Sequence, residues 1–350
     1  MSQTEATVVP FGAPKALTSG PLSRAVSFIA LLARRKPMGF AGLLFIVLMV
    51  LVAAFPRVIA THDNPGATSV APRFQSYCLG PRDTFLCPTV VERSALTGDR
   101  TVPGSLKQPF GTDSVGHDNY SRIVFGARWA LYVGVGAVLI STTIALVVGL
   151  TSGYFLGKYD AAVQRVVDAV MALPTLVVLL ALPAMIGKAD LDGPLPFDEP
   201  SVTFFKLVVI LGILGGAGGS RVIRASVISV RSAQYLDAAR TIGATDGRIM
   251  LRHVLPNIFG ALMVQATISL GGLILAEAAL SFLGFGVVDP NKPTWGQMLN
   301  RAQQVASVHP WQAIWPGLFI ALAVFSFNML GDALRDLLDP RLRGARGGFG

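Results

Sequence analysis

The sequence is short of charged residues. Only 14% of its 350 residues are charged, whereas a soluble domain carries roughly a quarter. Hydrophobic residues make up 52%, the mean hydropathy is +0.57, and several apolar runs reach the ~20 residues that cross a bilayer. This combination excludes an ordinary soluble domain and predicts an all-α integral membrane protein.

Motifs for catalysis and cofactor binding are missing as well. The sequence has no GxxxxGKS or GxxxxGKT loop to cradle phosphates, no HExxH zinc motif and no GxSxG nucleophile elbow. Its two cysteines form no CxxC motif, and its four histidines are scattered. We therefore expect no catalytic, cofactor-binding or metal-binding residues in this chain, and we predict that it is not an enzyme.

The net charge of +9 does not indicate nucleic acid, because no basic patch with interleaved aromatic residues is visible. Basic residues instead flank the apolar runs, as the positive-inside rule describes for cytoplasmic loops. Arg34, Arg35 and Lys36 directly precede the first run, which continues to full membrane length and so does not read as a cleavable signal. The N-terminus is therefore expected in the cytoplasm.

Six apolar stretches predict six transmembrane helices with both chain ends in the cytoplasm. The expected spans are residues 38–59, 129–156, 166–186, 204–223, 258–283 and 312–331. Pro174 and Pro183 are expected to bend the third span, and a static kink is favoured over a moving gate. At the second span, Gly149, Gly153 and Gly157 are spaced four residues apart and let another helix approach closely, and packing within the subunit is favoured over a dimer interface.

Three further side chains carry expectations of their own. Glu277 is an ionisable group in the fifth span, so it is a candidate functional residue, with a structural role as the open alternative. Trp295 and Trp311 are expected as anchors at the membrane interface.

The long loop of residues 60–125 falls outside the membrane and holds both cysteines. Cys78 and Cys87 would lie on the oxidising side, close enough in sequence for a small disulfide loop. Two unpaired thiols are the alternative, because sequence does not show the geometry.

A polar island at residues 231–257 separates two of these spans. Ser232 is expected to cap a first short helix, and Gly243 to end it in the left-handed conformation. The apolar face of that helix would be formed by Tyr235, Ala238, Ala239 and Ile242. Thr245 or Asp246 would cap a second helix that stops at Pro256.

The island resembles the EAA loop of ATP-binding-cassette (ABC) importer permeases. The resemblance rests on Asp237-Ala238-Ala239, Gly243 and the closing Leu255-Pro256, with LDAARxIGAxxxRIxxRHVLPN closest to the branch that imports oligopeptides, dipeptides and nickel. Asp237 replaces the usual Glu and keeps its charge, and His253 replaces an aliphatic residue. The resemblance implies that the ATPase-coupling residues are Tyr235, Asp237, Ala238, Ala239, Arg240, Gly243, Ala244, Leu255 and Pro256.

A second stretch resembles the segment before the second span of the same permeases, GTDxxGRDxxSRxxxGxR. The matching residues are Gly111, Thr112, Asp113, Gly116, Asp118, Ser121, Arg122, Gly126 and Arg128. His117 stands where Arg is usual, and we expect it to be a hydrogen-bonding surface residue.

The resemblance covers about residues 34–342 and implies a type I ABC importer permease fold with a long extracytoplasmic loop after the first helix. The expected organisation is a flexible cytoplasmic arm (1–37), a first transmembrane helix (38–59), an extracytoplasmic loop (60–125), a five-helix permease core (126–331) that includes the coupling loop (231–257), and a cytoplasmic tail (332–350).

The same resemblance implies a subunit of a bacterial plasma (inner) membrane importer of peptides. Its expected partners are a homologous second permease in a heterodimer, two cytoplasmic ABC ATPase domains that bind ATP and Mg²⁺, and an extracytoplasmic substrate-binding protein. Nickel or another small solute is the alternative substrate. A proton-coupled secondary transporter and a membrane scaffold are the alternatives from other classes.

Overall fold

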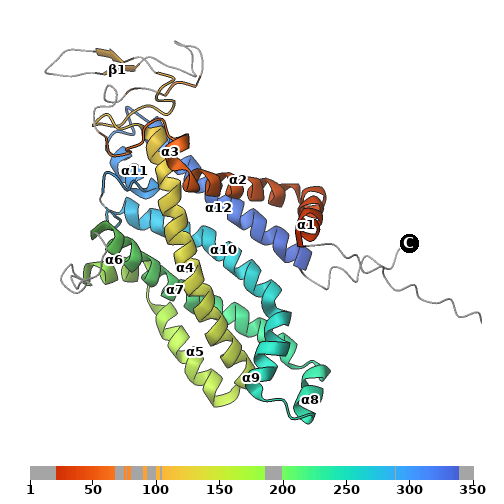
Figure 1. The fold of residues 1–350 in the computed structure, drawn as a ribbon. Coiled ribbons are helices and arrows are strands. Elements are labelled where there is room, and N and C mark those ends of the chain that lie inside the picture. Colours follow the sequence, from red (N-terminus) through yellow and green to blue (C-terminus); the bar gives the residue numbers. More distant parts are fainter. Residues whose placement is uncertain are drawn as a thin grey trace, which may run out of the picture.

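The computed structural model describes residues 21–67, 75, 77–79, 90–92, 100–102, 105–185, 199–287 and 289–338, which are almost entirely helical (Figure 1). The elements are α1 (Pro21–Arg35), α2 (Pro37–Ala54), α3 (Pro56–Ile59), β1 (Val90–Glu92), β2 (Arg100–Val102), α4 (Asn119–Phe155), α5 (Gly157–Ala172), α6 (Thr175–Met185), α7 (Glu199–Arg231), α8 (Gln234–Thr241), α9 (Asp246–Ile249), the π-helical turn η2 (Met250–Val254), α10 (Leu255–Phe282), α11 (Trp295–Ala302) and α12 (Trp311–Leu338).

Five helices among the described residues are long and apolar enough to cross a membrane. They are Pro37–Ala54, Asn119–Phe155, Thr203–Arg231, Asp246–Phe282 and Trp311–Leu338. Each contains one of the predicted spans in whole or in large part, and four extend well beyond it. The second begins at Asn119 instead of residue 129, the third continues past residue 223 to Arg231, the fourth begins at Asp246 instead of residue 258, and the fifth continues past residue 331 to Leu338.

The third predicted span is not a single helix. It is divided into α5 and α6, and residues 157–165, between the second and third predicted spans, form the first turns of α5. The break lies at Leu173, which is extended (φ −74°, ψ 129°) directly before Pro174. Proline disfavours the helical conformation in the residue before it and has no N–H to donate. Pro183, by contrast, lies within α6 and does not end it.

The N-terminal region departs from the expected flexible arm, because residues 21–35 form helix α1; residues 1–20 lie outside the described part. Pro37 then occupies the first turn of α2, where a missing N–H costs nothing. Between the two helices, Lys36 forms an ion pair with Asp336 near the end of α12. The first span is thereby tied to the last at one end of the molecule.

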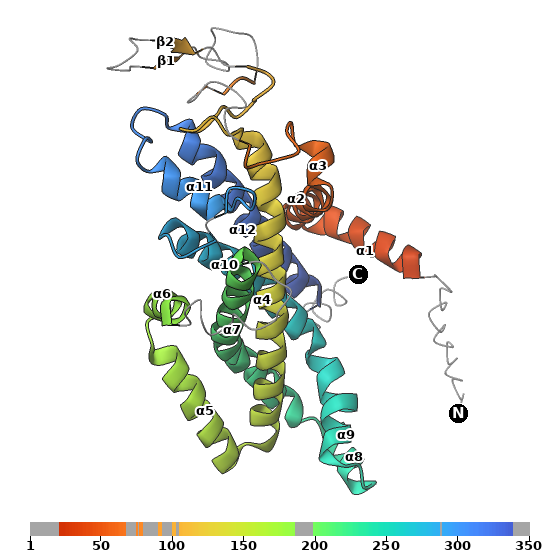
Figure 2. The same cartoon turned by 60° about the vertical axis from the view of Figure 1, so that its left-hand side comes forward.

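Two short strands in the loop after the first span depart from the all-α prediction. β1 and β2 form an antiparallel pair with Val90 opposite Val102 and Glu92 opposite Arg100. This hairpin lies at the end of the molecule opposite α8 and α9, as two views turned by 60° agree (Figures 1 and 2).

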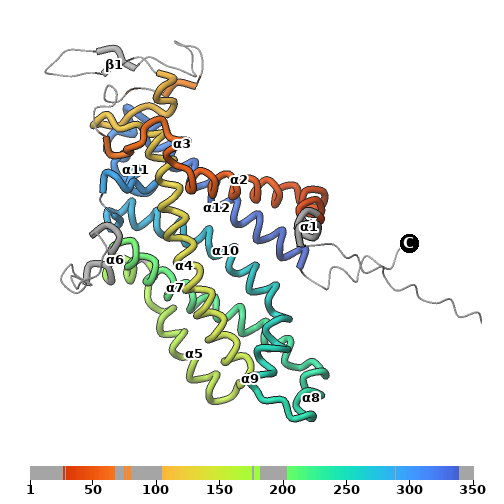
Figure 3. The backbone as a smooth tube through the Cα atoms, viewed as in Figure 1, coloured from red at the N-terminus to blue at the C-terminus, as the bar shows by residue number. Residues whose placement is uncertain are grey.

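The long helix α4 runs between these two ends and makes its most extensive contact with α7 (Figure 3). Glycines bring the two backbones together: a Cβ on Gly149 would lie 2.7 Å from the Ser220 carbonyl oxygen, and one on Gly153 would lie 2.9 Å from that of Arg224. Small residues serve this purpose in membranes, where association depends on close packing rather than on the hydrophobic effect. The prediction of glycine packing within the subunit is confirmed for Gly149 and Gly153. It is wrong for Gly157, which begins α5 with a φ of +62° and where a Cβ would meet no atom within 4 Å.

Candidate functional site

The element at residues 231–257 protrudes from the helical body as α8 and α9 (Figure 1). The first short helix forms as predicted, but its cap differs. Ala233 occupies the N-cap position without a side-chain hydrogen bond, and Ser232 is exposed one residue too early to cap. The start of α8 is set instead by the turn from α7, in which the Ala233 N–H donates to the Val230 carbonyl at 3.0 Å.

The two sides of α8 face different surroundings. Leu236 is fully buried, and Ala239 is 6% exposed, in one cluster with Ile249. Tyr235 (45% exposed) and Ile242 (85% exposed) lie on the outer side. The predicted apolar face is therefore wrong at Ala239, which faces the subunit's own core. The outer face consists of Tyr235, Ala238 and Ile242.

The turn that ends α8 confirms the prediction for Gly243. Its φ is +83°, in the left-handed region that favours glycine. Its N–H donates to the Arg240 carbonyl at 2.9 Å, and the Ala244 N–H reaches back to the Ala239 carbonyl at 3.0 Å. This pair of bonds is the Schellman motif, which satisfies carbonyls that a helix end leaves unpaired.

The second helix does not stop at Pro256. Residues 246–282 form one continuous helix in which Leu255 and Pro256 belong to the first turn of α10. The π-helical turn η2 precedes them, and the Leu255 N–H donates to the Met250 carbonyl. The wider turn accommodates the proline ring, which in a regular helix clashes with a carbonyl one turn back. Thr245 takes the N-cap position of α9 but makes no side-chain cap bond.

An open groove of about 390 Å³ lies between α8 and the η2 turn. It is lined by Tyr235, Ala238, Ala239, Ile242, Ala244, Arg248, Arg252 and His253. The apolar part of the lining includes the small side chains of three alanines, and the basic part includes Arg248 and Arg252. Four of the predicted coupling residues, Tyr235, Ala238, Ala239 and Ala244, therefore share one concave surface, whereas Leu255 and Pro256 do not line it.

The two carboxylates of the element are already engaged within the chain. Asp237 forms an ion pair with Arg240 at 3.2 Å, and Asp246 accepts a hydrogen bond from the Tyr154 hydroxyl at 2.6 Å. Contact with the Tyr154 side chain, together with the charges of both carboxylates, raises the pKa of Arg240 above its ordinary value. Among the described residues, Arg248 and Arg252 form no ion pair, so the groove retains a basic side.

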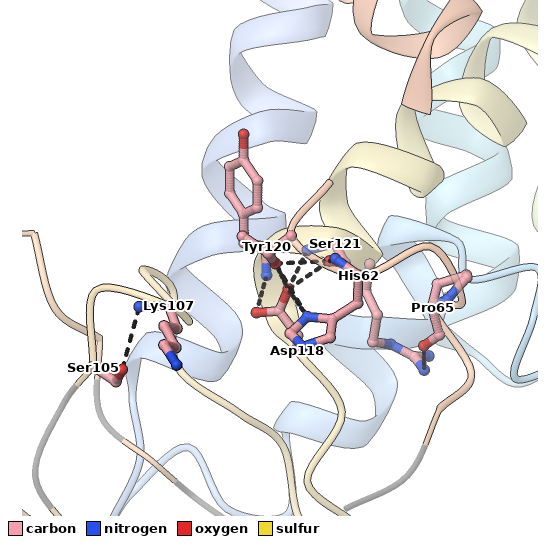
Figure 4. A network of polar contacts seen from close by, with 9 residues as sticks. His62, Pro65, Ser105, Lys107, Asp118, Tyr120 and Ser121 are labelled. Atoms are coloured by element: carbon pink, nitrogen blue, oxygen red, sulfur yellow. Dashed lines mark hydrogen bonds and ion pairs between the residues drawn. The ribbon is translucent and has the colours of Figure 1, made fainter. Parts of the chain in front are cut away.

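The second motif lies at the other end of the molecule and organises the start of α4 (Figure 4). Asp118 caps the helix by accepting from the Ser121 N–H at 2.9 Å and the Tyr120 N–H at 3.3 Å. Its carboxylate also accepts from the hydroxyl of Thr61, and the Ser121 hydroxyl accepts from the His62 N–H at 3.0 Å. The motif thus fastens the segment after α3 to the head of α4.

His117 is buried, not at the surface as expected. Its Nδ1 lies 2.6 Å from the Asp113 carboxylate, which also accepts the His117 N–H at 2.9 Å. Burial raises the pKa of Asp113, but the hydrogen bonds and charge of His117 outweigh it and hold the pKa below its ordinary value. The adjacent Arg122 is 1% exposed and donates to the Pro65 carbonyl at 3.4 Å. The described contacts of this motif are made within the chain, where they hold the loop after α3 against the start of α4.

The remaining candidates lie away from the groove. Glu277 is buried and accepts a hydrogen bond from Ser281 at 2.7 Å.

Trp295 and Trp311 are buried within the protein, so the prediction of membrane-interface anchors is wrong. The Trp295 ring N–H donates to the Ile123 carbonyl at 3.0 Å. Cys78 is disulfide-bonded, but Cys87 lies outside the described residues, and their pairing stays a prediction.

Two important residues of the site were missed. Leu236 anchors α8, and Tyr154, from the end of α4, contacts both α8 and α9. A signal for Leu236 was present in the sequence, because it is a large apolar residue between Tyr235 and Asp237. Nothing in the sequence connects Tyr154 with residues more than eighty positions later.

The chain is similar in sequence to known transport proteins. A family model described as binding-protein-dependent transport system inner membrane component matches residues 145–344. The dipeptide transport system permease protein DppC of Bacillus subtilis is 36% identical over 266 residues, which cover 76% of this chain and 77% of the relative. The glutathione transport system permease protein GsiD of Escherichia coli O157:H7 is 32% identical over 311 residues, which cover 89% of each chain. A solved structure of the MetNI methionine ABC transporter in inward-facing conformations aligns with a TM-score of 0.46 and 15% identity, over 61% of this chain and 96% of that one.

Proposed function

Because the chain belongs to the family of binding-protein-dependent transport system inner membrane components, we propose that it is a translocation subunit of an ATP-driven importer of peptides. The relatives support the substrate class, since one is named for dipeptides and another for glutathione, a tripeptide. The observation that carries the proposal is α8, a protruding helix that exposes Tyr235, Ala238 and Ile242 beside a groove.

Membership of this family implies a multi-pass membrane protein that works with ATPase and permease subunits. The finer assembly follows from the proposal. The chain forms a heterodimer with a related permease, and an extracytoplasmic binding protein delivers the peptide. Two cytoplasmic ABC ATPase domains bind ATP and Mg²⁺, which this chain does not hold itself.

The exposed side of α8 is the surface that we assign to the ATPase. A helix seated in a cleft passes on a displacement, whereas a flexible loop absorbs it. The outer apolar residues would be removed from water in that cleft, and the basic groove side chains Arg248 and Arg252 would meet acidic groups of the partner. Charge complementarity of this kind sets the orientation of docking.

Uptake into reconstituted vesicles tests the transport function. The chain, its partner permease, the ATPase and the binding protein are placed in proteoliposomes that contain ATP, with ionophores collapsing every ion gradient. Labelled dipeptide, labelled glutathione and nickel ions are offered in turn. We expect ATP-dependent uptake of peptide. Uptake that follows a proton gradient without ATP would contradict the proposal, and ATP-driven uptake of nickel alone would contradict the substrate class.

Ala238→Trp tests the docking surface. Ala238 is exposed at the centre of the outer face, so an indole there is expected to block the close approach of the ATPase without disturbing the subunit's own core. We expect at least about tenfold weaker association, which corresponds to about 1.4 kcal/mol, measured as the ATPase that co-purifies with the membrane subunits. Ala238→Ser adds a single oxygen and should retain the partner. Equal recovery with both variants would place the ATPase elsewhere.

Cysteine labelling tests the orientation. Thr241 belongs to α8 and Leu106 to the segment before α4, and both are exposed. The labelled α8 and the start of α4 lie at opposite ends of the molecule (Figure 1). With a membrane-impermeant maleimide, Thr241→Cys should react only from the cytoplasmic side and Leu106→Cys only from outside. Reaction of both from the same side would overturn the assigned topology.

A further inference from the structure

The last turn of α4 contains a side chain that reaches both limbs of the protruding element. Tyr154 is 3% exposed, and its hydroxyl donates to the Asp246 carboxylate at 2.6 Å. The guanidinium carbon of Arg240 lies 5.7 Å from the centroid of the Tyr154 ring, within cation–π range. Arg240 belongs to α8 and Asp246 to α9, so the two contacts stand on either side of the reversal at Gly243.

The same turn of α4 is also fastened to the helices beside it. Ser152 donates to Asp160 at the start of α5, and the guanidinium of Arg224 in α7 meets that carboxylate with two nitrogens, Nε at 2.7 Å and Nη2. A two-pronged contact of this type fixes orientation as well as distance. At Gly153 the backbones of α4 and α7 are also close together, because an added Cβ would lie 2.9 Å from the Arg224 carbonyl oxygen.

We propose that Tyr154 is a positioning residue that couples the α8–α9 reversal to α4 and, through α4, to α7. With the contacts formed, α8 and the end of α4 move as one body, so a displacement received at α8 reaches the spans. Without these contacts, Arg240 and Asp246 are no longer held to α4, so the backbone of the turn at Gly243 can change conformation. A displacement of α8 is then absorbed by the turn instead of reaching the spans. The inference rests on the proposed function, in which α8 receives the ATPase.

The hydroxyl is the part of Tyr154 to remove first. Tyr154→Phe keeps the ring in the core and the ring face offered to Arg240, and removes the hydroxyl with its hydrogen bond to Asp246 and its polar contact with Arg240. A hydrogen bond to a charged group is worth enough to shift the balance between fastened and released turns about tenfold. Asp246→Ala removes the same bond from the other side, and Asp246→Asn leaves an acceptor in place.

The test uses the assembled importer in nanodiscs and measures the ATP hydrolysed per peptide transported. We expect Tyr154→Phe and Asp246→Ala each to raise this ratio several-fold, and the double variant to raise it no further, because both remove one shared interaction. Asp246→Asn should restore much of the coupling. Tyr159→Phe is the matched control: Tyr159 is half-exposed and bonds Thr151 at 3.2 Å, away from α8.

A distance measurement separates positioning from a general loss of structure. Spin labels at the exposed positions Thr241 and Lys158 report on α8 relative to the α4–α5 turn. We expect a broader distance distribution in Tyr154→Phe, with unchanged recovery of all subunits and an unchanged distribution in Tyr159→Phe. If Ala238→Trp does not release the ATPase, the proposed docking surface is at fault. If it does, and Tyr154→Phe changes neither the ratio nor the distribution, Tyr154 has no positioning role.

Discussion

Gly243→Val should leave the subunit folded in the membrane while its ATP hydrolysis loses the response to loaded binding protein. The φ of +83° at this position costs a non-glycine residue about 1–2 kcal/mol, and a β-branched residue tolerates it least. A Cβ there meets no atom within 4 Å beyond the neighbouring residues, so we expect the effect to come from backbone strain. That cost is small beside the ~5–15 kcal/mol that stabilises a typical domain.

The strain acts on the turn that orients α8. Relieving it requires Gly243 to leave the left-handed region, which breaks the bonds from the Gly243 and Ala244 N–H groups to α8. A cost of 1–2 kcal/mol corresponds to roughly a 5- to 30-fold fall in the population with the native turn. The measurement is ATPase stimulation and peptide uptake in the reconstituted importer.

Two control variants make the result specific to the left-handed turn. Gly243→Asn should be tolerated better, because asparagine visits that region more readily. Gly247→Ala introduces a methyl group four residues later, in α9, where φ is not positive and no atom lies within 4 Å. It should behave as the unaltered protein. Normal stimulation in Gly243→Val would show that the reversal does not orient the coupling helix.

Local chemistry was sufficient to predict this turn, but not the orientation of α8. A left-handed glycine is dictated by sterics within a few residues, so Gly243 is evident from sequence. The eight-residue helix carries apolar side chains on two sides, Tyr235 and Ala238 on one and Leu236 and Ala239 on the other. Which side faces the body depends on Ile249 and Ile223, which are remote in sequence. Periodicity alone therefore assigned Ala239 to the wrong face.

Proline shows the same division between local and tertiary causes. Pro174 ends a helix, whereas Pro183, Pro256 and Pro316 lie within helices or in their first turn. The missing N–H is common to all four, but the surroundings decide whether the chain continues, as the π-helical turn before Pro256 shows. The length of the apolar runs was therefore enough to locate the spans. It was not enough to predict that the helix breaks completely between α5 and α6 at Pro174, because the surroundings of each proline decide that.

The membrane-interface prediction failed for a related reason. Trp295, the first residue of α11, packs against α4 and α12. Its ring occupies the space that a side chain at Gly126 would need, and its N–H donates to the Ile123 carbonyl. The preference of tryptophan for the membrane interface describes residues that face lipid. Hydropathy does not reveal whether a ring at the end of a span faces lipid or protein.

Gly149→Ala should lower the thermal stability of the subunit more than Gly247→Ala or Gly218→Ala, each of which also adds one methyl group. The added Cβ would lie 2.7 Å from the Ser220 carbonyl oxygen, 2.8 Å from the Ile223 Cβ and 3.0 Å from the Arg224 nitrogen. Two of these atoms are backbone, so α4 and α7 must move apart. Overpacking of this kind costs about 1–3 kcal/mol. The gain of roughly 0.5–1 kcal/mol that alanine brings to a helix does not offset it.

Gly218→Ala is the matched control for that variant, because it adds the same methyl group to α7 on a side where the nearest atom, the Met171 Cε, is 3.9 Å away. Thermal unfolding in detergent should show a lower midpoint for Gly149→Ala and an unchanged or raised midpoint for Gly218→Ala. Separation of α4 from α7 also moves Arg224 away from Asp160 and loosens the turn that holds Tyr154. Gly149→Ala should therefore show weakened coupling below its unfolding temperature as well. A variant as stable and as well coupled as the parent would mean that the two helices do not depend on backbone contact at Gly149.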